Sequence, residues 1–181
     1  MEEQTLESAL NRLRAHEVET NCRFAVFKAT KNFGNSCLET ARKVFWKDQN
    51  SVKVGRQEFT GIPFVVLGQK VFDCQFGKNR KARRKAKQQE KKKEKDHQYT
   101  KGRKFLVQYT KKSSCPARCV FREICRFPAF QVSQDSTSNE KDRIAEEILV
   151  QIRCGEEIKH ERVIITCLAT TEDHTCNTFE E

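Results

Sequence analysis

Two isolated cysteines and a closing His-x-Cys pair are the features that most constrain the fold of this chain. Cys74 and Cys115 stand far apart, and His174-Thr175-Cys176 follows near the end of the sequence. Thiolates and imidazoles are preferred zinc ligands, and four protein ligands leave no open position for a substrate, which is typical of a structural site. On an extended segment His174 and Cys176 point to the same face. The pattern predicts one structural zinc ion held by residues from distant strands.

A plainer interpretation of the cysteines stays open. Forty residues separate Cys74 from Cys115 and 58 separate Cys115 from His174, so the sequence lacks a compact C-x2-C knuckle. Free cysteine is often a small buried hydrophobic residue. The 181-residue chain has nine cysteines, an odd number. Its first residues are acidic and polar, unlike a secretory signal peptide, and its apolar runs are too short to predict a membrane span. We therefore expect a reducing compartment, where cysteines are thiols or metal ligands.

Positive charge is concentrated in residues 78–104. This segment has 14 Lys or Arg against three acidic residues, a net charge of +11, whereas the whole chain has +10, which leaves −1 for the rest. Such a cationic block indicates a polyanionic partner or a nuclear-import signal. A solvated, flexible loop is the alternative. Strong helix formers without an apolar stripe predict a helical or disordered insertion here.

Local patterns predict helices near the N-terminus. Leu6, Leu10 and Leu13 form one apolar stripe and predict a short amphipathic helix over 5–17. Ser36 and Glu39 form an S-x-x-E capping box, which predicts a second helix running to about residue 48. For residues 143–154, a helix followed by a strand fits the apolar pattern, and periodicity does not separate the two.

Strands are predicted where β-branched and aromatic residues gather, in 61–74, 104–110, 117–127 and 161–170. Gly68 indicates a turn or bulge, so that Cys74 ends a strand or hairpin. In 117–127 alternation places Arg118, Arg122 and Arg126 on one face, which we expect to be cationic. The opposite face carries the predicted core residues Cys119, Phe121, Cys125 and Phe127.

Taken together, GIPFVVLGQKVFDCQFG, the basic insertion, KKSSCPARCVFREI and DHTCN resemble the zinc-binding DNA-binding modules of the WRKY, glial-cells-missing and FLYWCH superfamily. Within it, the chain is most like far-red-impaired-response and Mutator-type transposase N-terminal domains, and CPARCVFREICRFPAF looks like the calcium-responsive transcription factor domain. The resemblance implies a small sheet with one zinc between strand ends and a strand that enters the DNA major groove. It implies the ligands Cys74, Cys115, His174 and Cys176.

Two departures from that superfamily affect the ligand assignment. The closing pair is His-x-Cys where many relatives have His-x-His, and the interval before His174 is long. Cys154, His160 or Cys167, which lie inside that interval, could replace one of the four ligands.

The sequence thus predicts an α+β fold: a small antiparallel sheet of four to five strands with a structural zinc site, one or two flanking N-terminal helices and the basic insertion. Residues 1–20 would be the N-terminal helix and 22–181 the zinc-binding domain. We expect a sequence-specific, double-stranded-DNA-binding module of a nuclear transcription regulator or domesticated transposase, without enzymatic activity, membrane contact or small-molecule substrate. Import receptors would bind the basic tract. The expected DNA contacts are Arg80, Lys81, Arg83, Arg84, Lys85, Lys87, Arg103, Lys104, Lys111, Lys112, Arg118 and Arg122.

Two other functions compete with DNA binding. An RNA- or protein-binding nuclear adaptor would use the basic tract mainly for import, but the aromatic pattern of RNA-recognition sheets is missing from the sequence. A zinc- or magnesium-dependent nuclease or transposase has less support. Neither H-E-x-x-H nor H-x-E with P-C-x-x-C occurs in the sequence.

Overall fold

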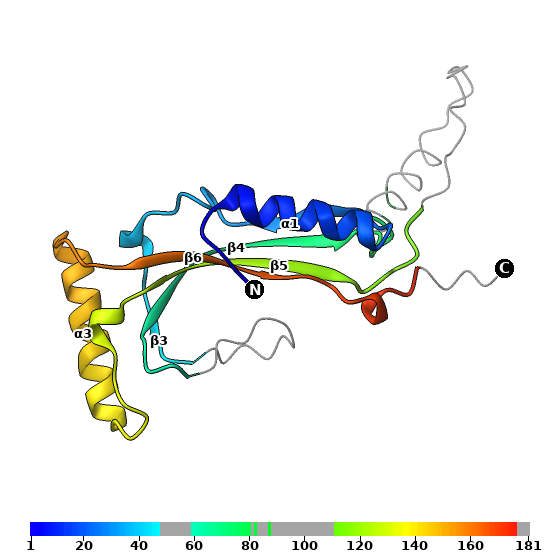
Figure 1. The fold of residues 1–181 in the computed structure, drawn as a ribbon. Helices are drawn as coiled ribbons and strands as arrows, with labels where there is room; N and C mark the ends of the chain where they lie inside the picture. Colours follow the sequence, from blue (N-terminus) through cyan, green and yellow to red (C-terminus); the bar gives the residue numbers. More distant parts are fainter. Residues whose placement is uncertain (48–58, 81, 83–86, 88–110, 177–181) are drawn as a thin grey trace, which may run out of the picture.

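A twisted antiparallel sheet forms the centre of the α+β fold (Figure 1). The computed structural model describes residues 1–47, 59–80, 82, 87 and 111–176. Five of the six strands of the sheet follow the order β1-β6-β5-β4-β2, and the sixth, β3, also pairs with β4. Their bounds are β1 Glu2–Glu3, β2 Phe24–Ala29, β3 Val44–Phe45, β4 Phe64–Cys74, β5 Arg118–Arg126 and β6 Glu161–Cys167. Two helices, α1 Leu6–Glu19 and α3 Ser138–Cys154, and three short 3-10 turns complete the described fold. No described helix is both long and apolar enough to cross a membrane.

The long strands β4 and β5 were both predicted from their β-branched and aromatic content. Their antiparallel register runs from Phe64 opposite Arg126 to Asp73 opposite Arg118. The register shifts between Val66 and Gly68, which confirms the bulge expected at that glycine. Cys74 ends β4, as predicted, and its thiol is therefore presented at the end of the sheet.

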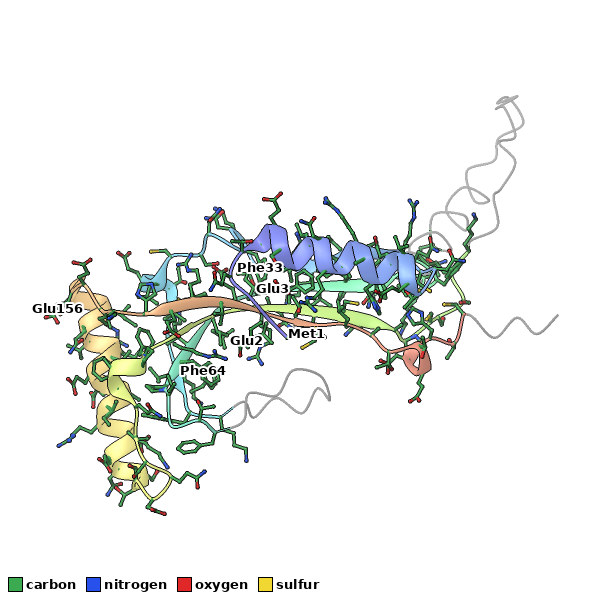
Figure 2. All side chains as sticks on the ribbon, viewed as in Figure 1. Met1, Glu2, Glu3, Phe33, Phe64 and Glu156 are labelled. Atoms are coloured by element: carbon green, nitrogen blue, oxygen red, sulfur yellow. The ribbon has the colours of Figure 1, made fainter. Side chains whose placement is uncertain are left out.

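The two faces of the sheet hold different apolar clusters. The face under α1 packs Phe72, Cys119 and Phe121 against Ala9 and Leu13 of the helix. The opposite face is made by Phe64, Val71, Val120, Ile124, Ile165 and Cys167. Figure 2 shows Phe33 and Phe64 on opposite sides of the sheet, in agreement with these clusters.

Alternation along β5 is confirmed, but its second face is not an open cationic surface. Cys119, Phe121, Cys125 and Phe127 are all fully buried, as expected for the core face. On the other face Arg118 is exposed, whereas Arg122 and Arg126 are half-buried between apolar neighbours. Arg126 donates to Glu2 of β1, and Arg118 donates to Asp73 of β4. Two of these three arginines are therefore paired with acidic residues.

The two helices cap opposite regions of the sheet (Figure 1). Helix α1 matches the predicted N-terminal helix, and the Thr5 side chain caps it by accepting from the Ser8 N–H. Its residues Ala9 and Leu13 share one core with the sheet. Helix α3 resolves the ambiguity in 143–154, because that whole segment is helical; Thr137 caps its start and Gly155, at φ 70°, ends it.

The helix predicted from Ser36 to about residue 48 is wrong. Only a 3-10 turn, Leu38–Thr40, forms there, and the chain then extends into β3. The Ser36 hydroxyl donates to the fully buried carboxylate of Glu123 instead of capping a helix. Val44 and Phe45 pair with Val65 and Phe64 of β4. A long-range contact and strand pairing thus override the local capping signal. The strand predicted at 104–110 lies outside the described residues.

Candidate metal centre

Four buried side chains that are far apart in the sequence meet at one end of the sheet. The thiols of Cys74, Cys115 and Cys176 and the imidazole of His174 place their ligand atoms within 4.8 Å of one another. The Cys74 and Cys176 sulfurs are 3.8 Å apart, and His174 Nδ1 lies 3.7 Å from the Cys115 sulfur and 3.4 Å from the Cys176 sulfur. The predicted convergence is confirmed, and these four residues could hold a metal ion.

The spacing of the ligand atoms fits a tetrahedral metal ion. Zinc–sulfur bonds of about 2.3 Å and zinc–nitrogen bonds of about 2.0–2.1 Å at tetrahedral angles put two sulfurs about 3.8 Å apart and sulfur and nitrogen about 3.6 Å apart. The observed separations lie close to these values. A disulfide would instead need sulfurs about 2.0 Å apart, so Cys74 and Cys176 are not bonded to each other.

A tight turn brings Cys74 and Cys115 together. After β4 ends, the Gly77 N–H donates to the Cys74 carbonyl at 2.7 Å, and residue 77 pairs with Cys115 in an isolated bridge. A Cβ on Gly77 would lie 2.8 Å from the Cys74 carbonyl oxygen, so this close approach requires glycine. The Cys115 N–H donates to the Phe76 carbonyl at 3.1 Å. Both thiols are therefore fixed by backbone contacts made within the turn.

A short 3-10 turn after β6 orients the His-x-Cys pair. Thr170 and Asp173 form a reciprocal capping box around the turn Thr171–Asp173. His174 then adopts an extended backbone, with φ −90° and ψ 126°. His174 and Cys176 are buried whereas Thr175 is exposed, which confirms that the first and third residues of the motif share a face.

The electrostatic surroundings differ among the ligand groups. Burial raises the pKa of the Cys74 and Cys176 thiols above the ordinary value. At Cys115 burial acts in the same direction, but hydrogen bonds with the backbone of Ala117 and Thr175 and with the Cys176 and Cys74 side chains together lower the pKa of that thiol. Burial, and then the nearby charge of His16, lowers the pKa of His174, which favours the neutral, metal-binding imidazole. A divalent cation would favour all three thiolates.

A fifth candidate ligand lies at the cluster and was missed in the sequence. The Cys22 sulfur is 3.6 Å from His174 Nδ1, and Cys22 is only 1% exposed. The three alternatives named from the sequence lie elsewhere. Cys154 is exposed at the end of α3, His160 donates from Nδ1 to the Ile158 carbonyl, and Cys167 packs in the cluster on the opposite sheet face. Among the described residues none of these three joins the metal-binding group.

Two of the predicted DNA-contacting arginines lie together beside the metal centre. Asp73, the residue before Cys74, accepts from Arg80 at 2.7 Å and from Arg118 at 2.9 Å, one arginine on each carboxylate oxygen. Burial by itself would raise the pKa of Asp73, but the interactions with Arg80 and Arg118 are stronger, and the net pKa of Asp73 is lowered. The Arg80 guanidinium lies 3.7 Å from the ring centre of Phe27 and that of Arg118 lies 5.5 Å from it. We call Phe27, Asp73, Arg80 and Arg118 the arginine platform.

The other predicted contacts are distributed differently. Arg122 is half-buried, and desolvation lowers the pKa of its guanidinium. Lys87, Lys111 and Lys112 are exposed. Lys81, Arg83, Arg84, Lys85, Arg103 and Lys104 lie outside the described residues.

The fold and site define a small α+β domain with a buried cluster of three cysteines and one histidine at one end of its sheet. The chain belongs to the family described as amyotrophic lateral sclerosis 2 chromosomal region candidate gene 8 (ALS2CR8), whose model matches residues 35–181. The matched range contains the four clustered ligands and begins after Cys22. No curated protein and no solved structure matches the chain. The resemblance to WRKY, glial-cells-missing and FLYWCH modules stays a prediction.

Proposed function

We propose that this chain is a nuclear, sequence-specific DNA-binding module whose fold is held by one structural zinc ion. The observation that carries the proposal is the position of the arginine platform beside the metal centre, where exposed guanidinium groups are held by the residue next to a ligand. The basic tract at 78–104 adds sequence-independent attraction to DNA and a nuclear-import signal. The chain acts as a binding module, not as an enzyme.

Zinc is the proposed metal because of the types of the four ligands and because together they fill a tetrahedral coordination shell. Three soft thiolates and one imidazole in tetrahedral spacing favour zinc over harder ions such as magnesium or calcium. Four buried protein ligands leave no position for a reacting water, so the ion supports the fold and does not carry out catalysis. Metal analysis of purified protein tests this assignment: one zinc per chain is expected, and a chain that folds fully without any metal would contradict it.

The arginine platform suits a DNA groove because its guanidinium groups are ordered before binding. The Arg80 and Arg118 side chains remain 42% and 46% exposed although each donates to Asp73. Stacking on Phe27, itself 43% exposed, restricts the rotamers of Arg80. One carboxylate against two guanidinium groups leaves a net positive charge. Arginine can pair with guanine through two hydrogen bonds or contact a phosphate, so an ordered pair can do either at low entropic cost.

Strand β2 provides the edge of the sheet on which this platform lies. All of its residues from Ala25 to Ala29 are exposed, including Val26 at 56%. It pairs on one side only, with β4, so its outer backbone edge is uncovered among the described residues. An edge strand flanked by arginines has the shape of an element that enters a major groove.

Salt-dependent DNA binding with a matched pair of variants tests this interface. The double variant Arg80→Ala/Arg118→Ala removes two positive charges from the platform, and Arg143→Ala/Arg153→Ala removes two exposed charges from α3. We expect the platform variant to lose about 1–3 kcal/mol of binding free energy per arginine and to reduce the slope of log K against log salt by about 2. The α3 variant should bind like the wild type. Equal losses would reject the platform as the interface.

Competition assays separate this function from the alternatives. Duplex DNA should displace a labelled duplex better than single-stranded RNA of equal length does. Stronger competition by RNA would favour the adaptor function instead, and magnesium-dependent cleavage of either nucleic acid would favour a nuclease.

A further inference from the structure

Cys22 occupies a ligand-like position around the imidazole of His174. Its sulfur lies 3.6 Å from Nδ1, between the 3.4 Å of Cys176 and the 3.7 Å of Cys115. These separations match the distance of about 3.6 Å between sulfur and nitrogen on one tetrahedral zinc ion. Cys22 is not among the four residues whose ligand atoms all lie within 4.8 Å of one another, so its sulfur is farther than this from at least one of the other three thiols. It therefore lies beside the imidazole at the margin of the centre and must move inward to bind the same ion.

Local structure fixes Cys22 in this position from both sides. Helix α1 ends at Glu19, Asn21 adopts a left-handed backbone with φ 49°, and the Cys22 N–H donates to the Glu17 carbonyl at 3.2 Å. Two residues later Phe24 begins β2 directly opposite Cys74 in the sheet register. The Glu17 side chain also accepts from the Phe24 N–H at 2.6 Å. The helix-to-strand connection thus holds the thiol beside the ligand that ends β4.

The imidazole is the least supported of the five donors. Its Nε2 atom is buried and has no hydrogen-bond partner among the described residues. Metal-bound histidines usually donate their second ring N–H to an oxygen that fixes the ring, and this support is missing here. The neighbour of the ring is Phe24, at 5.7 Å between ring centres, which supplies an edge contact but no acceptor. The histidine is therefore the ligand most easily displaced.

We propose that Cys22 is a fifth, interchangeable ligand that takes the place of His174, so that the centre holds its metal either with three thiolates and the imidazole or with four thiolates. This inference rests on the metal site of the proposed function. In the exchange the metal–Nδ1 bond breaks and a metal–sulfur bond to Cys22 forms. The Cys22 thiol proton is released to solvent as the thiolate binds, and the displaced imidazole stays neutral, so the net charge of the centre falls by one. Four thiolates favour softer ions more strongly than the mixed set does.

The exchange would connect the N-terminal segment to the metal. Residues 1–21, with α1, reach the rest of the centre through Cys22 and β2, so the four-thiolate state binds this segment to the metal through a coordinate bond. Zinc loading would then restrict the end of α1, although the four grouped ligands all lie beyond residue 70.

Cobalt(II) titration of apo-protein variants tests the proposal, because cobalt occupies tetrahedral thiolate sites and its charge-transfer absorption rises with the number of thiolates. Removing the imidazole in His174→Ala should cost no more than about tenfold in cobalt affinity, the low end of the effect of losing an outer supporting group. Its absorption should be more intense than that of the wild type. The double variant His174→Ala/Cys22→Ser should bind cobalt more than about 100-fold more weakly than the wild type, because it loses both interchangeable ligands. The control His174→Ala/Cys119→Ser alters a buried cysteine outside the cluster and should bind like His174→Ala.

The outcomes separate this proposal from the metal site itself. If the wild type binds no metal, the proposed zinc site fails. If the wild type binds one ion but His174→Ala binds as weakly as His174→Ala/Cys22→Ser, the site stands and the exchange is rejected. Failure of His174→Ala to fold with zinc present would also reject it, since four thiolates should hold the fold. Alkylation with mass spectrometry gives a second measurement: in His174→Ala, zinc should protect Cys22, and a chelator should remove that protection.

Discussion

The two ends of the sheet are closed by different chemistry. At the end that bears the turn Thr171–Asp173, buried cysteines and a histidine meet, whereas α3 covers the opposite end (Figure 1). There, Ile148 and Ile152 of α3 pack on Val65, Cys125 and Phe127. The apolar end needs no partner, because each side chain buries hydrocarbon against another. The Cys/His end places polarisable, ionisable groups together, and these are stabilised fully only by a cation.

This difference predicts that variants at the two ends of the sheet will affect stability and metal content differently. A change at the Cys/His end should alter both, and a change at the α3 end should alter stability alone. Between the ends lies the buried Glu123 carboxylate, which accepts from the Gly34 N–H and the Ser36 hydroxyl and forms an ion pair with Arg162 at 3.4 Å. Variants at these three places test the contrast.

Loss of the metal should have the largest effect. Chelation, or the replacement Cys74→Ala, should remove the ion and unfold the Cys/His end, because apparent zinc-binding free energies of about 10 kcal/mol equal or exceed the stability of a small domain. Denaturant unfolding followed with metal analysis measures both quantities. Cys125→Ala is the matched control, since this thiol is fully buried at the α3 end and lies outside the cluster. Equal losses for the two cysteine variants would contradict a metal-dependent end.

Shortening a buried side chain at the α3 end should have the next largest effect. Phe127 is fully buried among Val65, Ile148 and Ile152, so Phe127→Ala should lower the free energy of unfolding by about 3–5 kcal/mol through lost burial and a cavity. The variant should still bind one metal ion per chain with unchanged affinity. A simultaneous loss of metal would mean that the two ends are energetically coupled, and it would contradict the expectation that changes at the α3 end alter stability alone.

Glu123→Gln should have an intermediate effect. The amide keeps the shape of the carboxylate but replaces one accepting oxygen by a donating nitrogen that faces other donors, which costs about 1–3 kcal/mol of unfolding free energy. Glu157→Gln, at an exposed site, serves as the control and should change stability by less than about 0.5 kcal/mol. Indistinguishable unfolding curves for the two variants would show that the buried carboxylate contributes nothing as an acceptor.

The sequence predicted the parts of the fold and site that depend on strand periodicity. Alternation placed Cys119 and Phe121 in the core, and the His-x-Cys spacing on an extended segment put His174 and Cys176 on one face. β-Branched content located β4, β5 and β6. These signals are reliable here because a strand repeats every two residues, so that a short motif determines which side chains share a face.

Features that depend on long-range contacts could not be predicted in this way. Ser36 had a local capping signal, but its partner is Glu123, 87 residues further along the chain. Strand β2 lacked a signal because its residues are exposed on both faces and show no buried alternation. Cys22 reaches the cluster only because α1 ends and β2 begins around it. A cysteine between a predicted helix and a possible strand would have been the only available indication.

The smallest effect is expected from two matched helix caps, one at the start of α1 and one at the start of α3. Thr5 accepts from the Ser8 N–H at 3.1 Å and Thr137 accepts from the Glu140 N–H at 3.2 Å. Thr5→Ala and Thr137→Ala should each lower the free energy of unfolding by about 1 kcal/mol, because each leaves one helix N–H without its cap. Since the caps lie on different helices without a shared partner, the double variant should show the sum within about 0.5 kcal/mol. Metal content should stay at one ion per chain in all three variants. If the two losses of unfolding free energy are not additive in the metal-loaded protein, α1 and the α3 end are energetically coupled. The two ends of the sheet would then not be independent.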